Sequence, residues 1–345
     1  MINRTKLLIS KKINLNYIFN LFLLFYLIIG LFLSLRTGVS TDAFIEEDIW
    51  TKNLELIKDF FGKSNDANLN LLQPENKYYG DPNLLEHWNK YFGIGFNFLS
   101  QLYILLAGLI MKFDGLSNDI SRVLLKHNLI FFTYFLSGIF AKKIVNLLIK
   151  DRFYSNIFLI FYLFYPYLIG HGFFNNQDMP FLCAWILSTY LSIKIFLKIL
   201  KSNNISFLNI FFISLSTSFL ISIRISGILI LLQYFITFII TSRLINESIY
   251  QILKIYFFKL FLFVLLTFAL IILFNPIFWL NPLLFFDSIN QMRNIQFGIC
   301  TLTLGNCMDA LNLPSSYIFI WLFFKLPLLS FIGLILFPFI ENFYF

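Results

Sequence analysis

The length of the uncharged apolar runs constrains this chain most. No residue from Phe153 to Gln177 carries a fixed charge, and none does from Met179 to Ile193. A run of about 20 apolar residues is long enough to cross a bilayer as a helix. Asp178 stands between the two runs, so we expect it near a membrane surface where two spans meet. An ionisable residue there is a candidate for a functional site, and the plainer alternative is a solvated turn that contains an Asp.

Composition extends this interpretation to the whole chain. Of its 345 residues, 59% are hydrophobic and 13% are charged, whereas about 25% are charged in soluble domains. We expect an all-α, polytopic membrane protein, because lipid forces each backbone group to find its partner within its own helix. The alternating pattern of an outer-membrane barrel is absent. The net charge of +8 does not indicate nucleic acid, since no basic cluster is interleaved with aromatic residues and cytoplasmic loops collect Lys and Arg anyway.

The hydropathy pattern predicts about eight spans in a single domain, 1–345. They are expected at 17–35, 126–146, 153–172, 180–199, a pair within 204–242, 255–275 and 317–340. Ten of the eighteen acids lie between 37 and 91. We interpret 37–125 as a large first outer loop with an interfacial or embedded helix at 91–111. A second outer loop is expected at 276–316.

The distribution of basic residues predicts the orientation. With 91–111 outside, the inner segments are 1–16, 142–152, 194–204 and 243–254, and they hold thirteen Lys and Arg against two acids. Because cytoplasmic loops carry an excess of Lys and Arg, the N-terminus is predicted to be cytoplasmic in a cell (inner) membrane. The outer loops then lie on the periplasmic or outer face.

This topology brings Asp42, Asp178 and Arg224 to one membrane face. A carboxylate can accept the proton of an attacking hydroxyl, and a guanidinium can hold a phosphate through two hydrogen bonds. The set therefore suits chemistry on a lipid-phosphate substrate. Each residue also has a plainer interpretation: Asp42 as an ordinary loop acid, and Arg224 as a side chain that reaches the interface.

Other candidates for substrate contact are His171, Lys325, Glu46 and Glu47. His171 is alternatively an interfacial histidine with satisfied hydrogen bonds, and Lys325 a side chain that extends to the headgroups. No metal ligands are assigned, and the sequence requires no cofactor; a divalent cation is left open.

Four segments in order resemble the GT-C superfamily of membrane glycosyltransferases, in the branch of protein O-mannosyltransferases and aminoarabinose transferases. They are GVSTD at 38–42, GHGFFNNQDMPF at 170–181, FNPIFWLNPLLFFDSINQM at 274–292 and LGNCMDALNLPSSYIFIWLFFKLPL at 304–328. Asp42 matches the position of the family's catalytic acid, while Ala43 stands where many members have Glu and Gln177 stands where Lys is common. Family members usually continue for several more spans, so a truncated or unusually short chain is expected.

The resemblance implies a polyprenyl-phosphate sugar donor, a glycan, lipid or protein acceptor on the outer face, and an acid in the first loop as base. Asp42 is then the base, and Asp178 positions donor or acceptor, or helps to bind a metal if one is used. A transporter or flippase for lipid-linked sugars is the alternative. That class usually places its polar groups at the bilayer midplane, whereas the acids here gather at one surface, which favours the enzyme. A catalytically silent assembly subunit is a third interpretation. A disulfide between Cys300 and Cys307 is also predicted, in an oxidising compartment.

Overall fold

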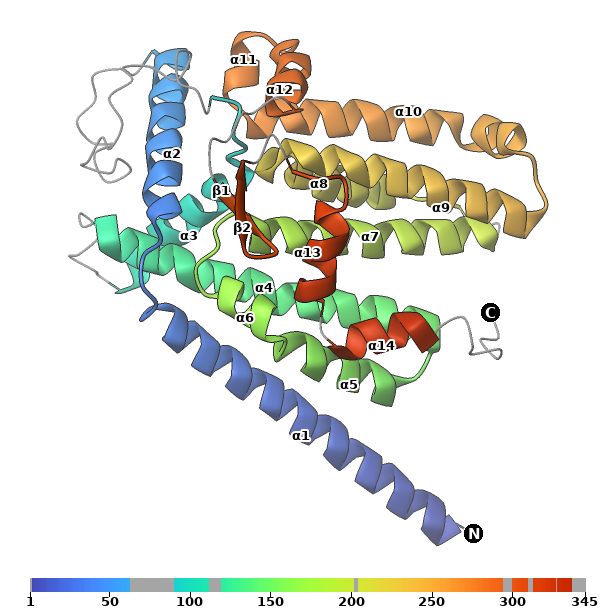
Figure 1. The fold of residues 1–345 in the computed structure, drawn as a ribbon. Helices are drawn as coiled ribbons and strands as arrows, with labels where there is room; N and C mark the ends of the chain where they lie inside the picture. The colour runs from blue at the N-terminus through green and yellow to red at the C-terminus, as the bar shows by residue number, and fades with distance from the viewer. Residues whose placement is uncertain are drawn as a thin grey trace.

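The computed structural model describes residues 2–62, 90–111, 119–201, 204–293, 300–309, 313–326 and 328–336. The long helices lie side by side, and α2, α11 and α12 gather at one end of them (Figure 1). The elements are α1 (Ile2–Ser34), α2 (Thr41–Phe60), α3 (Gly95–Met111), α4 (Asp119–Ile149), α5 (Arg152–Leu163), α6 (Pro166–Gly172), α7 (Asp178–Leu200), α8 (Phe207–Ile223), the 3₁₀ helix η3 (Ile225–Leu229), α9 (Ile230–Ile245), α10 (Ile249–Phe274), α11 (Ile277–Leu280), α12 (Leu284–Arg293), β1 (Cys300–Thr303), β2 (Asn306–Asp309), α13 (Tyr317–Lys325) and α14 (Leu328–Leu336).

Long apolar helices confirm a multi-pass helical membrane protein. Among the described residues, five helices are long and apolar enough to cross a bilayer, and the bent pair α5–α6 would make a sixth. The five segments are Asn16–Ser34, Ile120–Ile149, Asp178–Leu200, Ile225–Ile245 and Ile249–Phe274. The expected count of about eight spans is therefore too high for the part of the chain that the structure describes.

Two of the eight predicted spans are not among the helices that are long enough to cross a bilayer. The segment predicted at 317–340 is divided into α13 and α14, each of nine residues. Leu326 takes extended dihedral angles, because the following Pro327 disfavours a helical conformation in the residue before it. The first span predicted within 204–242 is α8, whose 17 residues make it one of the shorter apolar helices.

The bend between α5 and α6 has the same chemical origin. Tyr165 is extended and precedes Pro166 at the start of α6, and the two helices meet at 63°. The break leaves carbonyl groups at the end of α5 without helical partners. Two tyrosines supply donors: Tyr26 Oη donates to the Leu163 carbonyl oxygen at 2.6 Å, and the buried Tyr134 Oη donates to the same oxygen at 2.9 Å. The bend is thus held by side chains from α1 and α4.

The segment predicted as the first outer loop contains α2, α3 and the first residues of α4. α2 crosses the end of the bundle where α7 begins and α8 ends (Figure 1). Its buried residues Ile49 and Trp50 pack with Ile94, at the entrance to α3. α3 packs against α4 and α8, so the uncharged segment 91–111 covers the bundle rather than standing apart from it.

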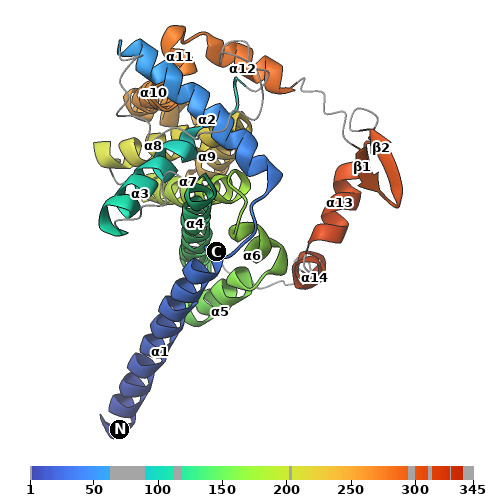
Figure 2. The ribbon, with the colours of Figure 1, turned by 90° about the vertical axis from the view of Figure 1, so that its left-hand side faces the viewer.

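One feature departs from the all-α prediction. β1 and β2 pair antiparallel, with Cys300 opposite Asp309 and Thr303 opposite Asn306. The two turn residues, Leu304 and Gly305, both have positive φ, which suits a two-residue hairpin turn. This hairpin and α13 stand to one side of the bundle (Figure 2).

The predicted disulfide lies in the same hairpin. Cys307 is disulfide-bonded, as expected, whereas the side chain of Cys300, its predicted partner, lies outside the described residues. Cys183 in α7 is a buried free thiol.

Candidate functional site

A buried ion-pair cluster joins α2 to α4. Lys126 Nζ lies 2.8 Å from Glu47 Oε1 and 3.8 Å from Glu46 Oε2, and the Lys126 side chain is 1% exposed. The apolar residues of α2 explain why these acids face inward. Ile49 and Trp50 are buried, so the face of α2 that carries them packs toward the bundle. Two carboxylates and one ammonium leave a net negative charge at this point. The predicted contact residues Glu46 and Glu47 are thus turned inward, toward a lysine that the sequence interpretation did not include.

Glu46 has the more unusual environment of the two acids. Burial raises the pKa of its carboxyl group to about 7, against the lowering effects of the Lys126 charge and of a side-chain hydrogen bond with Asn176. The negative charges of Glu47 and Asp42 raise this pKa further. A carboxyl group with a pKa near neutrality can exchange protons under ordinary conditions, so Glu46 is the described acid of this cluster that is best suited to proton transfer.

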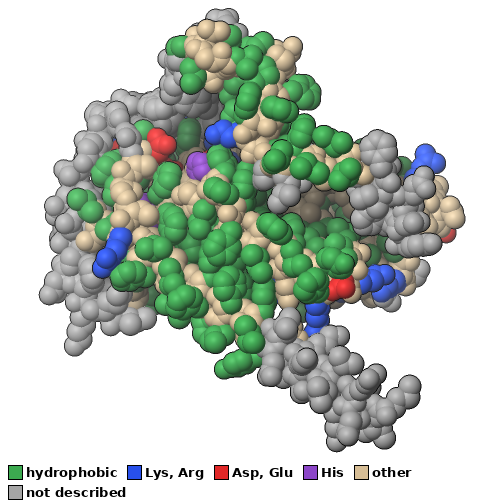
Figure 3. Space-filling model, turned by 60° about the horizontal axis from the view of Figure 1, so that its bottom comes forward, with side chains coloured by type: hydrophobic (Ala, Val, Ile, Leu, Met, Phe, Trp, Pro, Cys, Tyr) green, Lys and Arg blue, Asp and Glu red, His purple; other side chains and the backbone are tan. Residues whose placement is uncertain are grey.

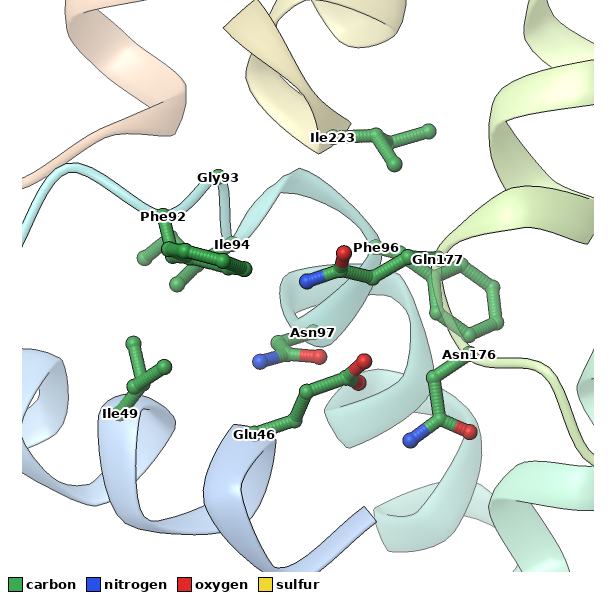
Figure 4. Close-up of a pocket in the computed structure, with 10 residues that line it drawn as sticks. All are labelled: Glu46, Ile49, Phe92, Gly93, Ile94, Phe96, Asn97, Asn176, Gln177 and Ile223. Carbon is green, nitrogen blue, oxygen red and sulfur yellow. The ribbon is translucent and has the colours of Figure 1, made fainter. Parts of the chain in front are cut away.

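A small pocket lies beside Glu46 (Figure 4). Figure 4 shows Glu46, Asn97 and Asn176 near one another, while Ile49, Phe92 and Ile223 form its apolar side. The space between the side chains has room for a water molecule rather than for a sugar. The pocket is therefore the size of one water molecule, beside a carboxyl group.

A second cluster forms where α7 begins. Asn175 Oδ1 accepts hydrogen bonds from the backbone N–H groups of Gln177 and Asp178, at 3.2 and 2.7 Å. These bonds satisfy N–H groups that a helix start leaves without partners. Asn175 Nδ2 lies 3.0 Å from Asp178 Oδ2 and 3.0 Å from His171 Nδ1. One asparagine thus fixes the start of the helix and orients two of the predicted site residues.

Asp178 also pairs with the predicted cation. Arg224, in the extended turn after α8, donates from Nη1 to Asp178 Oδ1. The two side chains remain 45% and 49% exposed, so the pair is accessible to a ligand. The sequence interpretation brought Asp178 and Arg224 to the same membrane face, and the structure places them in contact.

Lys325 reaches the same cluster from the far end of the chain. Its Nζ lies 5.1 Å from the centre of the Tyr167 ring, and that ring lies 4.5 Å from the His171 ring. The backbone carbonyl of Lys325 accepts a hydrogen bond from the Tyr165 hydroxyl. A continuous series of contacts therefore runs from Lys325 through Tyr167, His171, Asn175 and Asp178 to Arg224. In Figure 3, acidic, basic and histidine side chains gather around a hollow in a mainly hydrophobic face.

Asp42 lies apart from this series. It occupies the first turn of α2 and is exposed, and its charge acts on Glu46, one turn further along the helix. No contact joins Asp42 to Asp178 in the part of the chain that the structure describes. Within the same residues, no group of three or more His, Cys, Asp or Glu side chains could hold a metal ion.

The sequence interpretation missed Lys126 and Tyr167. Lys126 had one signal available, since it is a charge directly before the apolar run that begins at His127. No sequence feature indicated Tyr167, because one aromatic residue among so many is not distinctive.

Comparison with known proteins supplies no relative. No family model, no curated protein and no solved structure matches this chain, so the likeness to GT-C glycosyltransferases stays a resemblance of four segments.

Proposed function

We propose that this protein is a membrane glycosyltransferase that takes its sugar from a polyprenyl-phosphate donor. The acceptor is a hydroxyl-bearing glycan, lipid or protein on the outer face of the membrane. The observation that carries the proposal is the series of contacts from Lys325 to Arg224. Arg224 pairs directly with the Asp178 carboxylate, and Lys325 is linked to it through side chains at the same end of a bundle of apolar helices. A lipid phosphate requires such a position, because its headgroup is held at membrane depth by its hydrocarbon tail.

The cations suit the donor's phosphate. Arg224 offers several N–H donors in a planar group that matches phosphate oxygens, and Lys325 offers a mobile point charge. In the absence of substrate, Asp178 neutralises Arg224. A bound phosphate competes with Asp178 for the guanidinium, and the released carboxylate can then hydrogen-bond the sugar.

The reaction is a direct displacement at the anomeric carbon. The acceptor oxygen forms a bond to this carbon while the bond from the carbon to the phosphate oxygen breaks. The bonding electrons leave with the polyprenyl phosphate, and the acceptor proton passes to a carboxylate. We assign that role to Asp42, because it is exposed at the start of α2 and can meet an acceptor. Glu46, one turn away, holds a second carboxyl group whose pKa is near 7.

The orientation belongs to the same proposal. The basic ends of the helices would face the cytoplasm, and the end with α2, Asp178 and Arg224 would face outward. Maleimide labelling of intact cells tests this orientation, with Cys183→Ser as background. Asp59→Cys, exposed near the end of α2, should react from outside, and Lys201→Cys, exposed at the end of α7, should not. The reverse result would place the site on the inner face.

A transporter or flippase for lipid-linked sugars is the second candidate. The observation in its favour is the broken helix pair α5–α6, bent by 63°, because transporters often use discontinuous helices. The two candidates differ in one outcome: an enzyme cleaves the donor, whereas a transporter moves it intact across the bilayer.

The test uses the full chain in liposomes with a panel of polyprenyl-phosphate sugars and mixed acceptors, and measures released polyprenyl phosphate. Release is expected with at least one donor. Asp42→Asn should lower turnover by 10²–10⁴-fold, the usual cost of losing a general base, while Asp59→Asn on the same helix should leave it unchanged. Intact donor that crosses the bilayer without cleavage would instead establish the transporter. Release that survives in Asp42→Asn would remove Asp42 from the mechanism.

A further inference from the structure

A basic and aromatic cluster lies between α4 and α7, toward the end of the bundle away from the candidate site. It consists of Phe140 and Lys143 on α4 and of Tyr190 and Lys194 on α7, and we call it the Tyr190 cluster. The Phe140 and Tyr190 rings are stacked, with their centres 6.3 Å apart.

Two ammonium groups share one ring in this cluster. Lys143 Nζ lies 5.7 Å from the centre of the Tyr190 ring, and Lys194 Nζ lies 5.4 Å from it. Lys143 also lies 5.3 Å from the Phe140 ring. Two positive charges beside one ring raise the local positive potential, so an anion that binds here is stabilised.

The nearby acids do not supply that anion. Asp151 accepts a hydrogen bond from the backbone N–H of Phe153 and caps α5. Within the described residues, the ion pairs of the bundle involve Lys52, Lys126 and Arg224, not Lys143 or Lys194. Both lysines are exposed and can therefore reach a ligand from outside the protein.

The position of the cluster indicates the kind of anion. Lys143 lies near the end of the apolar run of α4, and Lys194 directly follows the uncharged run 179–193 of α7. These positions correspond to a membrane surface, where long basic side chains extend to headgroups and aromatic rings lie among them. We propose that the Tyr190 cluster binds the headgroup phosphate of an anionic phospholipid. The lysines pair with the phosphate, and the two rings contact the glycerol and the first acyl carbons.

This proposal does not depend on the glycosyltransferase assignment. Native mass spectrometry of the full chain in detergent tests it, by titration with phosphatidylglycerol and with phosphatidylcholine of the same acyl chains. The wild type should retain the first phosphatidylglycerol more tightly than phosphatidylcholine. Lys143→Gln/Lys194→Gln should lose affinity for phosphatidylglycerol by about fivefold for each lysine, and Lys143→Arg/Lys194→Arg should keep it.

Lys201→Gln/Lys254→Gln is the matched control. Both of its lysines are exposed on the basic helix ends, and neither shares an aromatic ring among the described contacts. An equal loss in the control would show general charge attraction and overturn the proposal, as would no loss in the Lys143→Gln/Lys194→Gln variant. Glycerol phosphate in large excess should not displace the lipid. Displacement would identify a free phosphate as the ligand and overturn the lipid assignment.

Discussion

Lys126 and Glu47 form an ion pair of 2.8 Å although 79 residues separate them along the chain. The Lys126 side chain is 1% exposed and the Glu47 side chain 11% exposed. This contact attaches α2, which carries the proposed catalytic acid, to α4 of the bundle. The position of Asp42 thus depends on a buried charge pair one and a half helical turns away.

Loss of one partner of this pair should destabilise the protein strongly. Lys126→Met is expected to lower the free energy of unfolding by about 3–5 kcal/mol, because it leaves buried carboxylates without their counter-charge. Thermal unfolding in detergent measures this loss, and Lys143→Met, which changes an exposed lysine on the same helix, is the control. The double variant Lys126→Met/Glu47→Leu should recover much of the stability. If Lys126→Met lowered the free energy of unfolding by less than about 1 kcal/mol, the pair would not be buried as described.

Stability should also depend on pH through Glu46. The pKa of its carboxyl group is raised to about 7 in the folded protein, mainly by burial, from an ordinary value near 4.5. The folded state therefore holds more protons than the unfolded state between these values, so this group's contribution to stability is lost as pH rises through the interval. Relative to wild type, Glu46→Gln should become more stable from pH 5 to pH 8. Melting temperatures of both proteins across this range measure the difference, and a constant difference would contradict the buried position of Glu46.

Gly93 tests how closely the entrance to α3 packs on α8. A Cβ atom at this position would lie 2.3 Å from the Ser222 carbonyl oxygen and 2.5 Å from the Ile223 carbonyl oxygen. Because both neighbours are backbone atoms, Gly93→Ala should cost about 1–3 kcal/mol of stability. Gly170→Ala is the control, since nothing lies within 4 Å of a Cβ there. Equal melting temperatures for the two variants would mean that α3 does not pack against the end of α8.

Arg224 should affect donor binding more than folding. The Arg224–Asp178 pair is about half exposed, so its loss should change stability by at most about 1 kcal/mol. If Arg224 holds the donor phosphate, Arg224→Ala raises KM for the donor at least tenfold with a smaller change in kcat, and Arg224→Lys lies between. Steady-state kinetics with the donor found in the liposome assay would measure both constants. A fall in kcat at unchanged KM would assign Arg224 to the chemical step instead.

Several local features were predictable because they depend on neighbours in the sequence. Pro166 and Pro327 disfavour a helical conformation in the residues before them, and each marks a helix break in the structure. Neither break was predicted, since the apolar character of 153–172 and of 317–340 outweighed one proline in each hydropathy pattern. Asp178 was expected where two spans meet, and it begins α7 in the structure.

The amino-acid sequence by itself determined the membrane character, the approximate positions of the long helices and the gathering of Asp178 and Arg224 at one end. These properties follow from run length and from the alternation of direction between successive spans. Only the tertiary structure decided that Glu46 and Glu47 turn inward to Lys126, that Tyr167 connects Lys325 to His171, and that Asp42 stays exposed. Such contacts depend on how the helices rotate and pack against one another, and residues 79 or 160 positions apart leave no local signal of that rotation.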